Sequence, residues 1–211
     1  MRKLHIHFLA FAVVLILPTN LCAEPLKAFT WNIEWFPGGR PNAKQAEKDK
    51  QFAAVQTELS KTKPDIFLAQ EITDEEAFKK LVATMPGMKV DVFSRSPEPG
   101  SDKIGSQQCC IASNLKADSA FFEPFKPNEN LPNLRRGFAF AALEHPDGGL
   151  IMVYSVHLKS NRGSDTPEGE QDVANTRAES ARQILAHIGD MKKRFAGRKI
   201  LGWMVGGDFN T

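Results

Sequence analysis

Cysteine is scarce in this chain, with three residues among 211. Cys22 lies near the N-terminus, and Cys109 and Cys110 are neighbours in an expected strand. Adjacent strand residues point to opposite faces of a sheet, so a bond between these two would distort the strand. The inventory therefore excludes a Cys/His metal cluster, and we expect two buried free thiols.

Long apolar runs are also lacking beyond the N-terminal segment, so we expect no transmembrane segment in the rest of the chain. At the N-terminus, Arg2 precedes an apolar run over residues 8–17. This layout is typical of a secretory signal peptide, because the run is shorter than the ~20 residues that span a bilayer. We expect cleavage of residues 1–23 and a secreted or periplasmic protein formed by residues 24–211. An uncleaved anchor and lipid attachment at Cys22 are the alternatives.

A basic excess is missing as well. The chain has 27 Lys and Arg residues against 25 Asp and Glu, and removal of Arg2 and Lys3 with the signal peptide leaves 25 of each sign. Proteins that bind nucleic acid non-specifically usually carry a clear basic excess. Any contact with phosphate must therefore come from a local group of residues.

Short apolar runs alternate with helix-patterned stretches, which indicates one domain over residues 24–211. Strands are expected over residues 26–36, 65–72, 90–94, 107–114, 138–145, 150–159 and 201–205. Helices are expected over residues 44–61, 73–85 and 171–195, with loops over 96–106, 122–132 and 160–170. Thr73 is the expected N-cap of the second helix, with Glu76 as its capping-box partner. Apolar strands separated by amphipathic helices predict an α/β (α+β) fold, a four-layer αββα sandwich of two mixed sheets with helices outside.

Five polar residues stand where a purely structural pattern would not place them. They end or follow apolar strands, and they are Asn32, Glu71, His157, Asp208 and Asn210. Each alone has a structural explanation, such as a turn or a satisfied core histidine. Together they make an oxygen-rich set with one imidazole, at the strand ends where layered α/β folds build their sites. Oxygen ligands suit Mg²⁺ or Mn²⁺, and an imidazole beside such a cation suits phosphoryl transfer.

Four short segments carry a family resemblance. They are Thr-Trp-Asn-Ile at 30–33, Gln-Glu at 70–71, Ser-Val-His-Leu-Lys at 155–159 and Gly-Asp-Phe-Asn at 207–210. In this order they resemble the endonuclease/exonuclease/phosphatase superfamily, whose fold is deoxyribonuclease I-like. The resemblance covers residues 27–211.

The resemblance implies a role for each residue. Glu71 would be the principal carboxylate ligand of the metal, and Asn32 would ligate it or orient a ligand. His157 would donate a hydrogen bond to the scissile phosphate and stabilise its developing charge. Asp208 would orient the attacking water, and Asn210 would hold a phosphate oxygen.

Arg136 lies where many members of this superfamily place an arginine that faces the phosphate. The alternative is that Arg135 and Arg136 form a solvated basic pair at the start of a strand. Substrate binding by Arg136 is the expectation that the resemblance supports.

The superfamily pattern ends in a Ser-Asp-His-like segment whose histidine is the general base. This sequence ends at Thr211, and neither His145 nor His187 lies in a matching motif. The resemblance therefore implies a domain that is incomplete at its C-terminus and lacks the last strands. A chain with this end is expected to hydrolyse phosphodiesters poorly.

The functional expectation is a secreted, divalent-metal-dependent phosphoesterase, a phosphodiesterase or nuclease that hydrolyses DNA or RNA, with no stable protein partner. Local basic charge would come from Arg135, Arg136, Lys159 and Arg162. A sphingomyelinase-like phospholipase C is the alternative, with Phe121, Phe122 and Phe125 as the candidate membrane-facing cluster. An inactive binding protein of the same fold is a further alternative.

Overall fold

The computed structural model describes residues 25–98, 103–132 and 134–210. The expected signal peptide, residues 1–23, lies outside the described residues. The elements are β1 (Ala28–Phe36), α1 (Gln45–Thr62), β2 (Ile66–Ile72), α2 (Glu75–Val82), β3 (Lys89–Phe93), β4 (Gln108–Ser113), β5 (Ala117–Pro124), β6 (Gly137–Glu144), β7 (Leu150–His157), α3 (Pro167–Arg194) and β8 (Ile200–Asp208). None of the described helices is both long enough and apolar enough to cross a membrane.

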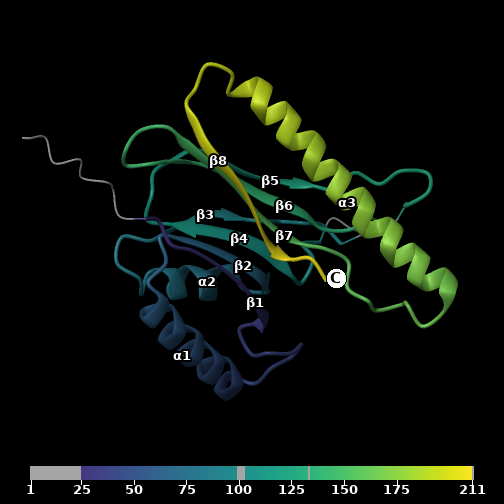
Figure 1. Cartoon of the computed structure of the whole chain (residues 1–211). Coiled ribbons are helices and arrows are strands. Elements are labelled where there is room, and N and C mark those ends of the chain that lie inside the picture. The colour runs from purple at the N-terminus through teal and green to yellow at the C-terminus, as the bar shows by residue number, and fades with distance from the viewer. Residues whose placement is uncertain (1–24, 99–102, 133, 211) are drawn as a thin grey trace, which may run out of the picture.

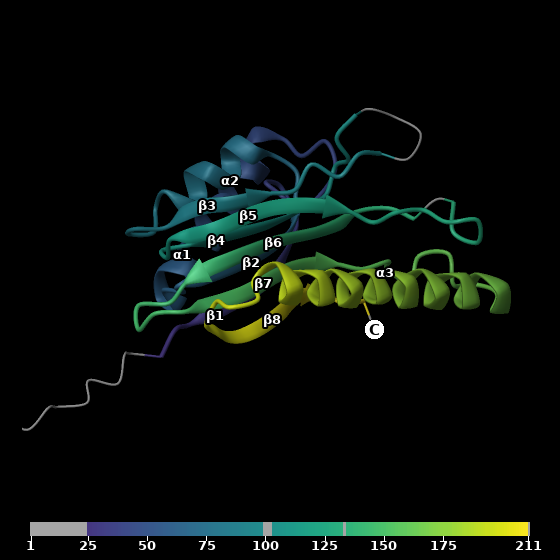
Figure 2. The ribbon, with the colours of Figure 1, turned by 90° about the horizontal axis from the view of Figure 1, so that it is seen from above.

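Two mixed sheets pack against each other. Their strand orders are β1-β2-β4-β3 and β5-β6-β7-β8, with β1–β2 and β7–β8 as the parallel pairs. Helices α1 and α2 cover the outer face of the first sheet, and α3 runs along the outer face of the second (Figures 1 and 2). The four-layer αββα sandwich predicted from the sequence is confirmed.

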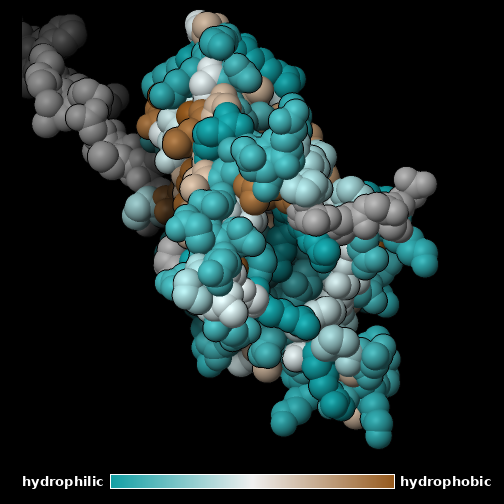
Figure 3. Space-filling model, turned by 90° about the vertical axis from the view of Figure 1, so that its right-hand side faces the viewer, coloured by the Kyte–Doolittle hydropathy of each residue, from teal (hydrophilic) through white to brown (hydrophobic). Residues whose placement is uncertain are grey.

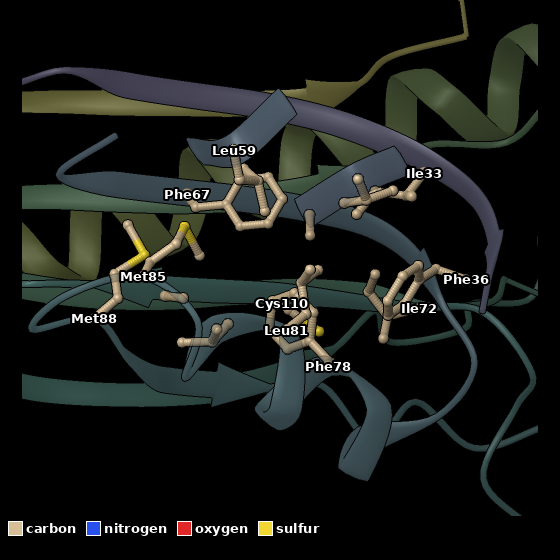
Figure 4. Packing of buried hydrophobic residues seen from close by; sticks show 14 residues of the cluster. Ile33, Phe36, Leu59, Phe67, Ile72, Phe78, Leu81, Met85, Met88 and Cys110 are labelled. Atoms are coloured by element: carbon tan, nitrogen blue, oxygen red, sulfur yellow. The ribbon is translucent and has the colours of Figure 1, made fainter. Parts of the chain in front are cut away.

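Three apolar clusters fill the spaces between the layers. One lies between the first sheet and its two helices, where Leu59, Phe67 and Phe78 are fully buried (Figure 4). A second lies between the second sheet and α3, and a third lies between the sheets. Burial of this apolar area is the main favourable term in folding.

The two cysteines divide between these clusters. Cys110 faces the helices of the first sheet and Cys109 faces the second sheet, so the alternation of strand side chains is as predicted. Both are buried free thiols, as expected. Burial raises the pKa of the Cys109 thiol to about 12, which keeps it protonated and unreactive.

Strand β5 was not predicted, because residues 122–132 looked like a proline-rich loop. The first of these prolines, Pro124, is the last residue of β5, an edge strand that pairs only with β6. Proline is tolerated at such a position because an edge strand leaves part of its backbone unpaired. The prediction of a loop was therefore wrong over its first residues.

Two helix starts also differ from the prediction. The N-cap of α2 is Asp74, whose Oδ1 accepts a hydrogen bond from Ala77 N at 2.9 Å. Thr73 Oγ1 instead donates to Phe36 O at 2.8 Å, which ties the end of β1 to the start of this helix. Helix α3 begins at Pro167 behind the cap Thr166, four residues earlier than expected, because proline fits the first helical turn.

The parallel pairs set the position of the polar strand ends. β2 packs on β7 and β1 packs on β8 across the space between the sheets. Within each sheet the two parallel strands have their C-terminal ends at the same edge. The contacts of Asn32 with Asp208 and of Glu71 with His157 show that these two edges lie on the same side of the sandwich, near the C-terminus marked in Figure 1. Residues far apart in sequence therefore meet there.

Candidate active site

The backbone of β1 and β2 is irregular where the site residues lie. Asn32 stands within β1 rather than at its end, and the β1–β2 register shifts between Asn32 and Phe36. Glu71 has a positive φ of 61°, and the β2–β4 register shifts around it. A non-glycine residue in the left-handed region carries strain of order 1–3 kcal/mol, which proteins retain mainly at functional sites.

The Asn32 amide joins the two sheets. Its Nδ2 donates to Glu71 Oε1 at 3.0 Å and to Asp208 Oδ2 at 2.8 Å. Its Oδ1 accepts a hydrogen bond from Glu34 N at 3.0 Å, which fixes the direction of the amide. Two carboxylates from opposite sheets are thus held beside one another by a single neutral group.

His157 faces both carboxylates. Its Nε2 lies 3.7 Å from Glu71 Oε1 and 3.7 Å from Asp208 Oδ2, and the side chain is only 2% exposed. Burial, and then the charge of Arg136, lower the pKa of His157 to about 3, against the opposing pull of Asp208. The ring is therefore neutral at physiological pH. Its buried Nδ1 has no hydrogen-bond partner among the described residues.

Asp208 is held in place by close backbone packing. Gly207 has a φ of 147°, and a Cβ there would lie 1.9 Å from Val156 O, so only glycine fits. Asn210 N donates to Asp208 Oδ1 at 2.9 Å, and Asn210 Nδ2 donates to Leu158 O at 3.1 Å. Asn210 thus orients Asp208 and ties the end of β8 to the residue after β7.

Arg136 is half-buried and its contacts are specific, unlike those of a solvated basic pair. Its Nη1 donates to His157 O at 3.1 Å and to Leu158 O at 2.6 Å. Its Nη2 donates to Gln107 Oε1 at 3.2 Å. Burial lowers the pKa of Arg136, but a guanidinium remains charged at any physiological pH. Arg136 therefore brings a fixed positive charge close behind the imidazole.

The sequence did not reveal two further polar contacts. Gln107 Nε2 donates to Glu71 Oε2 at 2.6 Å. Gln70 is 1% exposed and its Nε2 donates to Ser155 Oγ at 3.0 Å across the two sheets. Gln107 carries no signal in a single sequence, because a polar residue at a strand end has many uses. Gln70 is marked only as part of the Gln-Glu segment at 70–71, which does not reveal its contact with Ser155.

The donor set fits a hard divalent cation. Two carboxylates converge beside a neutral imidazole, and carboxylate oxygens are donors that Mg²⁺ and Mn²⁺ prefer. Asn32 directs its Nδ2 at both carboxylates while Glu34 N engages its Oδ1, so of the two roles expected for Asn32 this geometry fits orienting a ligand. The described residues contain no group of three His, Cys, Asp or Glu side chains arranged to hold a metal ion. Mg²⁺ is often bound by only one or two carboxylates, with waters and substrate phosphates completing its shell.

A pocket of about 360 Å³ opens beside these residues. It is lined by Ser96, Pro97, Glu98, Gly105, Ser106, Gln107, Arg135 and Arg136. Figure 3 views the molecule from the right-hand side of Figure 1 and shows a hollow surrounded mostly by hydrophilic residues. The pocket reaches the site through Gln107, which contacts Glu71.

Basic charge gathers next to the pocket. Burial lowers the pKa of Lys159, and the charges of Arg136, Arg177, Arg162 and Arg135 lower it further. Within the part of the chain that the structure describes, none of these five cations forms an ion pair with a carboxylate. This local group supplies the basic charge that the neutral overall balance lacks.

The two other described histidines lie elsewhere. His187 is buried on α3, where its Nδ1 lies 3.0 Å from the Tyr154 hydroxyl, on the outer face of the second sheet. His145 lies at the turn between β6 and β7, where its Nδ1 accepts a hydrogen bond from Asp147 N. Neither contacts Glu71, Asp208 or His157 in any described interaction.

Solved structures share this fold. A Bacteroides thetaiotaomicron mannosyl-6-phosphatase superposes with a TM-score of 0.59 at 15% identity, covering 88% of this chain and 66% of that one. The human nocturnin catalytic domain with bound sulfate gives 0.62 at 16%, covering 89% and 64%. Truncated Caenorhabditis elegans TDP2 gives 0.54 at 19%, covering 88% and 62%. The chain thus spans slightly less than two thirds of the length of these structures.

Among curated proteins, no match was found. A model of the Endonuclease/Exonuclease/phosphatase family matches residues 29–211, which include the four motifs and every site residue predicted from the sequence. The chain therefore belongs to the Endonuclease/Exonuclease/phosphatase family.

Proposed function

We propose that this protein is a divalent-metal-dependent phosphodiesterase whose substrate is nucleic acid. One observation carries the proposal. Two carboxylates from opposite sheets share the Asn32 amide, and the neutral imidazole of His157 lies 3.7 Å from both Glu71 and Asp208. This arrangement destabilises the fold by itself, because grouped buried charges cost free energy unless a ligand compensates them.

Glu71 would hold Mg²⁺ or Mn²⁺, and Asn32 would orient its carboxylate through the hydrogen bond from Nδ2. When bound, the cation would act as a Lewis acid toward a phosphoryl oxygen. The side chain of Glu71 is 14% exposed and that of Asp208 is 29% exposed. The repulsion between the two carboxylates is therefore poorly screened in the free protein. That repulsion favours a cation at this position.

His157 would donate a hydrogen bond from Nε2 to a non-bridging phosphate oxygen. Its low pKa, about 3, means that it acts as a neutral donor whose strength grows as charge develops on that oxygen. The positive charge of Arg136, which contacts the His157 carbonyl, adds to the stabilisation.

Asp208 would orient the attacking water. Its Oδ1 is held by Asn210 N, and its Oδ2 accepts from Asn32, so the carboxylate is fixed on both sides. A positioned group of this kind gains from its fixed orientation toward the reacting atoms. In this account Asn210 acts mainly by holding Asp208, and its expected contact with phosphate stays a prediction.

The local basic group supports nucleic acid as the substrate class. The charges of Arg135, Arg136, Arg162 and Arg177 are close enough to Lys159 to lower its pKa. None of the five forms an ion pair with a carboxylate among the described residues. A single phosphate would need fewer cations, whereas a nucleic acid strand brings phosphates on both sides of the scissile one. The neighbouring pocket of about 360 Å³ is large enough for a nucleotide-sized group.

A sphingomyelinase-like activity has less support. Phe125 is 4% exposed and packs in the cluster under α3, while Phe121 and Phe122 are partly buried against the sheet clusters. These side chains are therefore engaged in the core and do not form a membrane-facing patch.

Location is part of the same proposal. The charge and apolar pattern of residues 1–23 supports a signal peptide and a secreted or periplasmic enzyme. N-terminal sequencing of the protein recovered from the medium or periplasm of an expressing cell should begin near residue 24. Recovery of the protein only in the cytoplasm with residues 1–23 intact would contradict it.

Substrate choice can be tested under single-turnover conditions, where even slow hydrolysis is detectable. Labelled single-stranded DNA, duplex DNA, RNA and sphingomyelin vesicles are each incubated with excess protein in Mg²⁺ or in EDTA. We expect Mg²⁺-dependent cleavage of a nucleic acid and none of sphingomyelin. Faster cleavage of sphingomyelin than of any nucleic acid would overturn the substrate assignment.

A further inference from the structure

The two oxygens of Glu71 have different surroundings. Oε2 accepts hydrogen bonds from Gln107 Nε2 at 2.6 Å and from Trp35 N at 3.2 Å. Oε1 accepts from Asn32 Nδ2 at 3.0 Å and is the oxygen that lies 3.7 Å from His157 Nε2. Oε2 is thus held by Gln107 and Trp35, whereas Oε1 lies beside the Asn32 amide and His157.

Gln107 is itself held in one orientation. Its Oε1 accepts from Arg136 Nη2 at 3.2 Å, so its amide nitrogen must point toward Glu71. Arg136 is in turn fixed, because its Nη1 donates to the carbonyls of His157 and Leu158. A continuous chain of hydrogen bonds therefore runs from the end of β7, through Arg136 and Gln107, to the carboxylate on β2.

We propose that Gln107 is a positioning residue, which orients Glu71 so that Oε1 alone faces the cation and substrate. The inference rests on the proposed function of Glu71 as the main metal ligand. Gln107 is expected to touch neither the metal nor the reacting atoms. It acts like the residues that hydrogen-bond to the metal ligands and orient them in many metal sites.

A purely structural role for Gln107 is the competing explanation, and its neighbour allows the two to be separated. Gln108 is 2% exposed, accepts hydrogen bonds from Ser94 Oγ and Ser96 N, and donates to Gly105 O. It organises the loop before β4 and makes no described contact with Glu71. Gln108 is therefore a matched control for damage to this loop.

The experiment measures Mg²⁺ affinity by calorimetry and stability by urea unfolding, in the wild type and in Gln107→Leu, Gln107→Met, Gln108→Leu and Glu71→Gln. Loss of an orienting partner typically weakens metal binding about 10- to 100-fold, which is the effect expected for both Gln107 variants. The methionine variant keeps the unbranched length, in case leucine disturbs folding. Gln108→Leu should lower stability and leave Mg²⁺ affinity within about twofold of the wild type.

The outcomes separate this inference from the proposed function. If Glu71→Gln weakens Mg²⁺ binding and both Gln107 variants bind it normally, Gln107 is not a positioning residue while the role of Glu71 stands. If Glu71→Gln binds Mg²⁺ as the wild type does, the proposed metal site itself is wrong. Failure of both Gln107 variants to fold, or equal effects of Gln107→Leu and Gln108→Leu on affinity, would assign Gln107 a structural role only.

Discussion

Replacing Asn32 by Asp tests the electrostatics of the site most sharply. The amide donates to Glu71 at 3.0 Å and to Asp208 at 2.8 Å. Aspartate removes both donors, each worth about 1.5–3 kcal/mol when the acceptor is charged. It also places a third carboxylate about 3 Å from the other two, a repulsion of about 5 kcal/mol per pair at an effective dielectric constant near 20.

Part of this cost is relieved, because Glu71 and Asp208 are 14% and 29% exposed and the new carboxyl can take up a proton. We expect a net loss of about 3 kcal/mol at neutral pH without divalent cations. For a domain of this size the loss corresponds to a Tm lower by about 6–12 °C. Adding about 10 mM Mg²⁺ should recover much of it, since a third carboxylate raises affinity for the cation and bound ligand stabilises the folded state.

Scanning calorimetry with and without Mg²⁺ is the assay, and Asn114→Asp is the control. Asn114 is exposed, and its Nδ2 donates to a single half-buried carboxylate, Asp65 Oδ1, at 2.8 Å. That substitution should change stability by no more than about 1 kcal/mol and should show no added response to Mg²⁺. Equal Tm values for the two variants, or an equal Mg²⁺ response of Asn32→Asp and the wild type, would refute the proposed arrangement of charges.

Three other predictions concern the backbone, a buried carboxylate and the basic group. Gly207→Ala puts a Cβ within 1.9 Å of a backbone carbonyl oxygen and should lower the free energy of unfolding, measured in urea, by more than about 3 kcal/mol. At Gly202 an added Cβ meets nothing within 4 Å, so Gly202→Ala should leave the free energy of unfolding nearly unchanged. Burial raises the pKa of Asp91 to about 6, whereas the pKa of an aspartate in the unfolded chain is about 4, so the folded protein loses stability as pH rises from about 4 to about 6. Asp91→Asn should therefore be more stable than the wild type by about 2 kcal/mol above this range and no more stable near pH 4, and a stability difference that stays constant across pH would contradict this. Arg135→Ala should weaken DNA binding and reduce the slope of log affinity against log salt by about 0.7–0.9, while Lys50→Ala on α1 should change neither.

The strand ends were predictable because apolar runs mark buried strands and an interrupting polar residue marks where each run stops. The structure has Glu71 next to the end of β2, and His157 and Asp208 as the last residues of β7 and β8, as this pattern indicates, while their roles stay predictions. The pattern could not give the contact that brings them together, because Asn32 reaches Asp208 over 176 positions of sequence. Such pairing depends on how two sheets stack, which no local pattern encodes.

The missed features share a physical cause. In the sequence Gln107 cannot be distinguished from its neighbour Gln108. The Gln107 side chain donates to Glu71, whereas the Gln108 side chain bonds to the loop before β4. Strand β5 carries a proline and alternates only between exposed and half-buried residues, so its apolar signal is weak. Features that depend on tertiary contacts, rather than on the period of local burial, were the ones that the sequence concealed.

The most direct test of the central claim separates metal binding from chemistry at the same site. Mg²⁺ affinity and single-turnover cleavage of labelled DNA or RNA are measured for the wild type, Glu71→Gln and His157→Ala. Glu71→Gln should lose both, because it removes the charge that holds the cation. His157→Ala should bind Mg²⁺ within about threefold of the wild type and cleave about 100-fold or more slowly, the usual effect of removing a donor to the developing charge. Cleavage by His157→Ala at the wild-type rate would contradict the account.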